Sequence, residues 1–396
     1  MYRATVPGSA RCHFIFGVPG KARLMGVFRI TMMKCMSLQV LAAALLLGSL
    51  DSVPSWGQQV SSAVLEPAPG QTLTEVARSE KHPEMHGAID ESLKAAHTKF
   101  ADLKEGKNAD YIPALAEVDS DLFGIAVVTV DGKVHAIGDA DYEFAIESIA
   151  KVFAYALALS QSKGDAIADL IGVDATGRPF NSIEAVAYKR GAEQNPFVNA
   201  GAIATVGLID GDTFQQKWGS IMGVHEAFAG RKLKVNEVVY ESEAATNQSN
   251  QAIAKLMLAY GKMEGDTEMI TDVYTRECSI NVSAKDLATM AATLANGGTN
   301  PVTHEEVLQP ENVPKVLAVM ATAGLYDDSG VWLYHVGLPA KSGVGGGIIA
   351  VAPGKFGIAA FSPPLDEAGN SVRAQKAIEM IVNRLGANPY ISKPAK

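Results

Sequence analysis

Several features are scarce in this sequence, and each scarcity excludes a class of protein. The 396 residues include three cysteines, Cys12, Cys35 and Cys278, too few and too widely spaced for a disulfide framework or a metal site. Long basic runs are absent and the formal net charge is −9, so we expect no nucleic-acid partner. The glycine run 345–347 lacks the lysine and helix start of a phosphate-binding loop. We predict neither a metal nor another cofactor.

The sequence also lacks the long apolar run that a membrane span requires. The run Leu38–Leu50 has 13 residues, whereas a spanning helix needs about 20. Arg29 and Lys34 precede it and the small residues Ser55 and Gly57 follow, which is the arrangement of a secretory signal. We predict that residues 1–58 form a signal peptide or N-terminal extension, that the protein is exported to the periplasm, and that the mature chain has no stable membrane span. An uncleaved anchor and a cytoplasmic location are the alternatives.

Helical periodicity is the main signal in the rest of the chain. Residues 59–80 are rich in Ser, Pro, Gln and Thr and are expected to form a flexible lead-in. Apolar residues recur at helical spacing over 82–104, which predicts a surface helix. The same spacing predicts a largely helical middle over 146–296, and further helices at 310–323 and 372–385.

Two hairpins are expected at opposite ends of this helical middle. The β-rich runs of Phe123–Gly138 flank Asp131-Gly132, a dipeptide typical of two-residue turns. A second hairpin, over residues 345–361, turns at Pro353-Gly354. Strands therefore come from both ends of the folded region and helices from its middle.

This order of elements predicts an α+β fold, an α/β sandwich. We expect an antiparallel β-sheet built from both chain ends and flanked by helices, with an inserted all-helical lobe. The expected folded domain spans residues 81–390. Its α/β part would comprise 81–145 and 300–390, and its helical lobe 146–299.

A polar pair stands out in the apolar helix predicted at residues 144–160. Ser148 and Lys151 are three residues apart and would share one helix face. A serine hydroxyl becomes a nucleophile when a nearby base takes its proton, and burial lowers the pKa of a lysine enough for it to act as that base. By itself the pattern more often means a capping serine and a lysine that reaches solvent.

A second motif gives the first one context. Lys341-Ser342-Gly343 lies immediately before the C-terminal hairpin. An early S-x-x-K followed by a late K-[ST]-G is the signature of the penicillin-recognising serine enzymes. Lys341 and Ser342 are therefore secondary candidates for the site.

Longer motifs carry a closer resemblance. The sequence resembles the serine-dependent glutaminase family, which has a β-lactamase-like or DD-peptidase-like fold and hydrolyses L-glutamine to L-glutamate and ammonia. The resemblance covers roughly residues 80–385 and rests on four segments: Pro179–Ser182, Asn195–Ile203, Leu325–Gly330 and Gly337–Ile348.

The resemblance assigns catalytic roles to four residues. Ser148 matches the family's nucleophile, which also contacts the substrate, and Lys151 matches its general base. Tyr111 matches a tyrosine that lines the active site. Tyr274 matches another tyrosine, which helps to relay protons near the Ser–Lys pair.

The resemblance also assigns substrate-binding roles. Asn199 matches a substrate-binding asparagine, and Glu243 and Asn250 match the pair that holds the amino-acid end. Tyr326 and Val344 match the remaining positions, and Val344 is expected to give its backbone amide to an oxyanion hole. These types suit an amino acid, because a buried ammonium group needs a carboxylate and a buried carboxylate needs neutral donors.

Four positions depart from the family pattern: Glu147 and Glu277 replace glutamines, Ala150 replaces a serine, and Ser249 replaces an arginine. A carboxylate beside the nucleophile favours the charged lysine. We therefore expect Glu147 to raise the pKa of Lys151 and to shift the pH optimum upward.

Two other functions remain open from the sequence alone. One is a β-lactamase or DD-carboxypeptidase on the same fold. The other is an exported amino-acid-binding protein that has lost catalysis through these departures. The resemblance also implies a homodimer or homotetramer.

Overall fold

The computed structural model describes residues 83–188 and 190–391. All of these residues belong to the unit Pro67–Lys396. The predicted signal segment 1–58 and the lead-in 59–80 lie outside the described residues, so both stay predictions. Across the described part of the chain, none of the helices combines the length and hydropathy needed to cross a bilayer.

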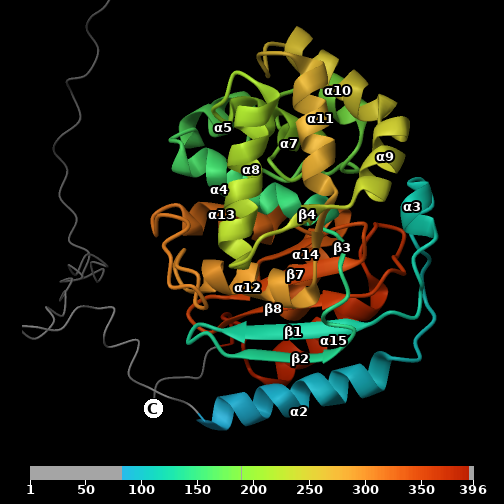
Figure 1. The fold of residues 1–396 in the computed structure, drawn as a ribbon, viewed down its shortest axis with the longest axis vertical. Coiled ribbons are helices and arrows are strands. Elements are labelled where there is room, and N and C mark those ends of the chain that lie inside the picture. The colour runs from blue at the N-terminus through green and yellow to red at the C-terminus, as the bar shows by residue number, and fades with distance from the viewer. Residues whose placement is uncertain (1–82, 189, 392–396) are drawn as a thin grey trace, which may run out of the picture. The chain divides into compact units, whose positions relative to one another are not determined.

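Both ends of the described chain contribute to a five-stranded antiparallel sheet (Figure 1). Its strand order is β2-β1-β8-β7-β6, so the N-terminal hairpin pairs with the C-terminal strands through β1 and β8. The fold class expected from the sequence is confirmed. The strands are β1 (Gly124–Thr129), β2 (Val134–Gly138), β6 (Ala340–Ser342), β7 (Gly347–Ala352) and β8 (Phe356–Phe361).

Both predicted hairpins are present, and local turn chemistry explains them. β1 pairs with β2 and β7 pairs with β8, each antiparallel. Gly132 and Gly354 take φ values of +86° and +70°, in the left-handed region that glycine enters without steric cost. Lys341 and Ser342 lie within the edge strand β6, which is the element immediately before the hairpin of β7 and β8.

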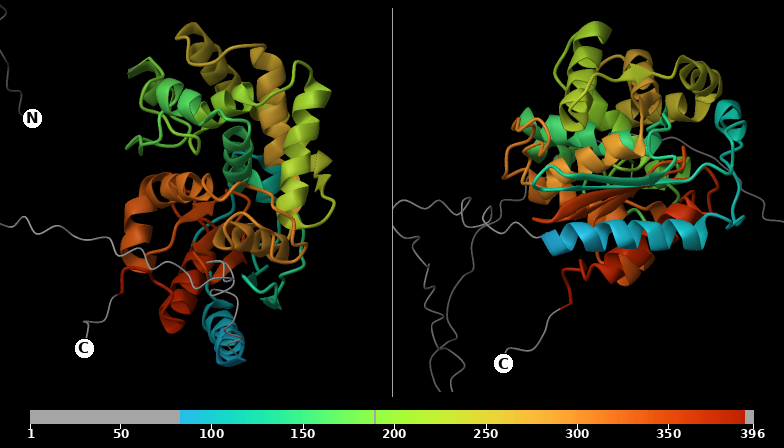
Figure 2. Two further views of the ribbon diagram at one scale, coloured as in Figure 1. Left: turned by 90° about the vertical axis from the view of Figure 1, so that its left-hand side faces the viewer. Right: turned by 60° about the horizontal axis from the view of Figure 1, so that its bottom comes forward.

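Helices cover the two faces of this sheet (Figure 2). Alternate residues of β1 take part in different cores: Ile125 and Val127 pack with α2 and α15, whereas Ala126 and Val128 pack with α12. Every residue of β1, β7 and β8 is buried, as expected for strands covered on both sides. The covering helices are α2 (Pro83–Phe100), α12 (Ala284–Ala295), α14 (Ser329–Val336) and α15 (Val372–Arg384).

The remaining helices form the lobe that bears the site. The lobe helices are α4 (Ala150–Ser160), α5 (Gly164–Leu170), α6 (Ile183–Tyr188), α7 (Asn199–Leu208), α8 (Phe214–Ala229), α9 (Glu237–Thr246), α10 (Gln248–Ala259) and α11 (Thr267–Cys278). The short helices α3 (Pro113–Ala116), η1 (Glu147–Ile149) and η2 (Tyr326–Asp328), and the longer α13 (Val313–Ala323), flank them.

Two details of the expected lobe, residues 146–299, were wrong. The lobe is not all-helical, because β4 (Lys234–Val235) and β5 (Ile280–Val282) form a small sheet with β3 (Phe144–Ala145). Strands of two or three residues are too short to show alternation in the sequence. In addition, α12 packs against β1, β7 and β8, so it belongs with the central sheet.

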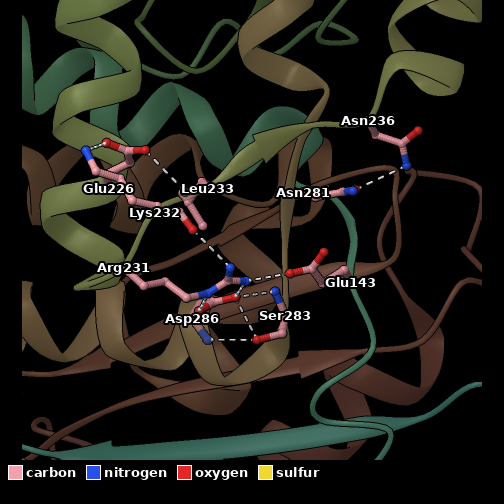
Figure 3. A network of polar contacts seen from close by, with 9 residues as sticks. All are labelled: Glu143, Glu226, Arg231, Lys232, Leu233, Asn236, Asn281, Ser283 and Asp286. Carbon is pink, nitrogen blue, oxygen red and sulfur yellow. Dashed lines mark hydrogen bonds and ion pairs between the residues drawn. The ribbon is translucent and has the colours of Figure 1, made fainter.

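A polar network ties α12 to the end of α8 (Figure 3). Ser283 and Asp286 form a capping box, in which Ser283 Oγ accepts from the Asp286 amide and Asp286 Oδ2 accepts from the Ser283 amide. Arg231, just after α8, donates to both carboxylate oxygens of Asp286 at 2.6 Å and to Glu143 at 2.9 Å. The network thus joins lobe and sheet through side chains with satisfied hydrogen bonds.

Candidate active site

The serine and the lysine lie at the junction of η1 and α4. Ser148 is 6% exposed and Lys151 1% exposed, and Ser148 Oγ is 2.9 Å from Lys151 Nζ. The preceding residue, Glu147, has a φ of +51°, which is unusual for a residue with a side chain. Such strain commonly occurs at functional sites, and here it occurs at the residue directly before the serine.

Lys151 is a buried amine whose pKa is lowered toward neutral pH. Burial lowers its pKa to about 8, although nearby acidic groups, among them Cys278, Glu243 and Glu147, oppose this shift. Its Nζ donates to Asn199 Oδ1 at 2.7 Å. With that bond made, the lone pair of a neutral amine remains available for the Ser148 hydroxyl.

Asn199 connects the lysine to two other helices. It begins α7, its Nδ2 donates to Asn250 Oδ1 of α10 at 2.9 Å, and its Oδ1 also accepts from the hydroxyl of Tyr274 of α11 at 3.2 Å. Lys151 Nζ lies 5.7 Å from the centre of the Tyr274 ring. Tyr274 therefore reaches the Ser–Lys pair through Asn199 in this structure.

Acidic groups gather on another side of the site. One carboxylate oxygen each of Glu147 and Glu243 and the Cys278 sulfur lie within 4.8 Å of one another. Burial raises the pKa of both carboxyls, that of Glu243 to about 7, and the charge of Glu243 raises the pKa of Glu147 further. Burial also raises the pKa of the Cys278 thiol, which keeps it protonated.

The loop that bears Val344 packs directly on the segment before the serine. A Cβ atom at Gly343 would lie 2.7 Å from the Ile146 carbonyl oxygen, and one at Gly345 would lie 2.5 Å from that of Ala145. Only glycine fits such close backbone approaches. This packing holds the buried Val344 beside the start of η1.

Tyr326, Lys341 and Ser342 form the wall next to this loop. The Tyr326 hydroxyl donates to the Ser342 carbonyl oxygen at 3.3 Å, and Lys341 Nζ donates to the same oxygen at 2.7 Å. Lys341 Nζ also lies 4.3 Å from the centre of the Tyr326 ring. Burial and the Lys151 charge lower the pKa of Lys341 well below its usual value, so Lys341 is a buried, internally bonded amine.

Tyr111 lies at the rim of the site. The residue is 53% exposed. Burial of its hydroxyl, and then the charges of Glu147, Tyr326 and Glu243, raise the pKa of that hydroxyl. Tyr111 is therefore partly exposed while its hydroxyl still feels the charges of the acidic groups.

The structure brings all the sequence-predicted residues into one region of the fold. Two neighbours received no role from the sequence, Phe180 and Cys278. Phe180 packs on Tyr326, with ring centres 4.5 Å apart, and lies 5.9 Å from Lys151 Nζ. Phe180 lies in Pro179–Ser182, one of the four segments that resemble the glutaminase family. That resemblance was the sequence signal that could have placed Phe180 near the site. Cys278 is buried and lies among acidic groups as well as apolar ones.

Comparisons with known proteins agree with this arrangement. A family model described as Glutaminase matches residues 106–390. A glutaminase from Colwellia psychrerythraea is 52% identical over 315 residues, which cover 80% of this chain and all of that protein. Glutaminase 1 from Escherichia coli K12 is 50% identical over 302 residues, covering 76% of this chain and 97% of the relative.

Solved structures give the same result. A structure described as a probable glutaminase matches with a TM-score of 0.76 and 49% identity, covering 77% of this chain and 99% of that one. A structure described as Mglu in its glutamate form matches with a TM-score of 0.73 and 36% identity, covering 79% of this chain and 71% of that one.

Fold and site together define an α+β protein of the β-lactamase-like class. Within that class, the chain belongs to the glutaminase family. These matches support neither a β-lactamase or carboxypeptidase nor a non-catalytic binding protein.

Proposed function

We propose that this protein hydrolyses L-glutamine to L-glutamate and ammonia through an acyl-enzyme on Ser148. The observation that carries the proposal is the 2.9 Å distance between Ser148 Oγ and Lys151 Nζ inside a buried site. Membership of the glutaminase family supports the substrate and the reaction.

Acylation begins with proton transfer from the serine. Neutral Lys151 takes the Ser148 proton as Oγ attacks the side-chain amide carbon, which gives a tetrahedral oxyanion. The backbone amides of Ser148 and Val344 are the proposed donors to this oxyanion. The Lys151 ammonium group then protonates the leaving nitrogen, and ammonia departs.

Deacylation repeats these steps with water. Lys151, neutral again, takes a proton from a water molecule that attacks the ester, and the returning proton restores the Ser148 hydroxyl as glutamate leaves. Asn199 keeps the lysine in place through its 2.7 Å hydrogen bond. Tyr274 steadies Asn199 from the opposite helix.

The other polar residues of the site are the proposed binding groups for the amino-acid end of the substrate. Glu243 is the proposed partner of the ammonium group, because a buried cation requires an anion. Asn250 and the hydroxyls of Tyr111 and Tyr326 are the proposed neutral donors to the substrate carboxylate. This arrangement favours a free amino acid over a peptide or a β-lactam.

A glutamine analogue that bears a diazoketone in place of the amide tests the nucleophile. We expect a covalent adduct on Ser148, located by mass spectrometry of peptides, and no adduct in Ser148→Ala. The same variant should bind glutamine by calorimetry and release no ammonia. An adduct on another residue, or ammonia release by Ser148→Ala, contradicts the mechanism.

We also propose that the protein is exported and that it assembles as a homodimer or homotetramer. Export rests on the pattern of residues 1–58, and assembly rests on the family resemblance. N-terminal sequencing of protein from the periplasmic fraction tests export and the cleavage position. Light scattering of the same preparation measures the oligomeric state.

A further inference from the structure

Two carboxyl groups lie next to the nucleophile where the proposed chemistry uses only one. Glu147 is 3% exposed and Glu243 is 8% exposed. Glu147 Oε1 and Glu243 Oε2 are both buried and have no hydrogen-bond partner among the described residues. An unpartnered buried oxygen costs free energy, and more so if the group is charged. Neither of these two oxygens is therefore hydrogen-bonded to a cation among the described residues.

Within the described part of the chain, Lys151 is the amine that acts on both carboxyls, and it already has other contacts. Lys151 acts electrostatically on both Glu147 and Glu243. Its Nζ is bonded to Asn199 and lies at Ser148, and acyl transfer requires it without charge. When Lys151 is neutral, the charge of the pair is offset either by a proton or by another cation.

Glu147 is also fixed in position. It lies immediately before the nucleophile with a φ of +51°. A Cβ at Gly343 would lie 3.3 Å from Glu147 Cβ, and one at Gly345 would lie 3.2 Å from Glu147 Cγ. The glycine loop thus leaves room for the Glu147 side chain while confining it beside Glu243.

We propose that Glu147 and Glu243 together form the binding site for the α-ammonium group of the substrate, with Glu147 as a second carboxyl that determines specificity for a free amino acid. The inference rests on the proposed function and assigns a role to a residue that departs from the family pattern. An ammonium nitrogen placed between the two oxygens donates to both, and its charge removes the repulsion between them. The protonated Cys278 is the third group beside the ammonium nitrogen, and it carries no charge.

Ligand binding then changes the proton content of the site. Without substrate, the two carboxyls hold a proton because their charges repel and burial disfavours ionisation. The ammonium group stabilises both carboxylates, so a proton leaves when an amine ligand binds. The other titratable groups that interact with the pair are Lys151 of α4, Tyr274 and Cys278 of α11, Tyr111, and Tyr326 of η2.

Calorimetry on the Ser148→Ala protein tests the proposal without turnover. The two ligands are L-glutamine and 4-carbamoylbutanoate, which has the same amide and carboxylate but no amine. Adding Glu147→Gln should weaken L-glutamine binding by roughly 10- to 100-fold, the usual effect of one charge-assisted hydrogen bond. Binding of 4-carbamoylbutanoate should change by less than about twofold. L-Glutamine binding at pH 7, compared in two buffers of different ionisation heat, should release more protons from the protein with Glu147 than from the Glu147→Gln variant, in which Glu243 alone can release a proton.

Glu277→Gln in the same Ser148→Ala background is the matched control. It makes the same substitution at another buried carboxyl, and it should leave the preference for the amine unchanged. Equal weakening of both ligands by Glu147→Gln, or no weakening of either, overturns the proposal. Absence of ammonia release by the wild type would overturn the proposed function instead, while these binding measurements would still decide the role of Glu147.

Discussion

His225 Nε2 of α8 lies 3.7 Å from Glu277 Oε1 of α11, and both side chains are buried. Neither of these atoms, nor Glu277 Oε2, has a hydrogen-bond partner among the described residues. His225 uses its other ring nitrogen to donate to the Ile221 carbonyl oxygen at 2.8 Å. Burial raises the pKa of Glu277 to about 8 and lowers the pKa of His225 to about 4, so both are neutral at pH 7.

Because folding raises the pKa of Glu277, we predict that this residue destabilises the folded protein as the pH increases. Below pH 4.5 the carboxyl is protonated in both the folded and unfolded states and has no effect. Between pH 4.5 and about 8 the unfolded chain loses the proton and the folded chain keeps it. The free energy of unfolding of the wild type should therefore fall by about 1.4 kcal/mol per pH unit relative to Glu277→Gln in this window.

Denaturant unfolding of both proteins at a series of pH values measures this difference. Glu268→Gln is the control, because it removes an exposed carboxyl from the same helix and should follow the wild type. If the Glu277→Gln and wild-type curves remain parallel from pH 5 to 8, Glu277 is ionised in the folded state and the neutral pair is wrong.

The lowered pKa of Lys151 predicts the pH dependence of catalysis. The neutral amine is the active form, so kcat/KM for glutamine should rise with pH and level off above about pH 8. Because Glu147 favours the charged lysine, Glu147→Gln should move the midpoint of this rise to lower pH. The measurement is a pH–rate profile of both proteins. Identical midpoints would show that Glu147 does not act on the lysine.

The position of Asn199 predicts an order among three variants. Lys151→Ala removes the base and should lower kcat at least about 1,000-fold. Asn199→Ala removes the hydrogen bonds to Lys151 and Asn250 and should cost at least about 100-fold. Tyr274→Phe removes one donor to Asn199 and should cost only about tenfold.

Single-turnover ammonia release by the three variants tests this order. A Tyr274→Phe variant as impaired as Lys151→Ala would show that the tyrosine exchanges protons directly with the Ser–Lys pair. Melting temperatures within a few degrees of the wild type serve as the control for folding.

Local chemistry explains what the sequence could predict. The turns at Asp131-Gly132 and Pro353-Gly354 depend on glycine conformations within each turn, and both hairpins were predicted correctly. The spacing of Ser148 and Lys151 also predicted their contact, since three residues span one helical turn.

Longer-range features could not be predicted in the same way. The left-handed backbone at Glu147 depends on the glycine loop that follows β6, almost 200 residues later. His225 gave no sequence signal, because its proximity to Glu277 arises only when α8 packs beside α11. Tyr274 was assigned to the Ser–Lys pair by resemblance, whereas its distance from Lys151 is set by how α11 packs on α7. Tertiary packing decides each of these cases.

The contact between β8 and α12 predicts that a single methyl group at Gly357 will destabilise the fold. A Cβ atom there would lie 2.1 Å from the Ala292 amide nitrogen and 2.6 Å from the Ala288 carbonyl oxygen, so helix and sheet would have to separate. Gly357→Ala should lower the free energy of unfolding by at least about 3 kcal/mol, as expected for severe overpacking.

Gly223→Ala is the matched control. Gly223 lies in α8 with no atom within 4 Å of an added Cβ, so alanine should stabilise that helix by about 1 kcal/mol. Denaturant unfolding measures both changes, and similar stabilities for the two variants would mean that the sheet and α12 are not packed this closely.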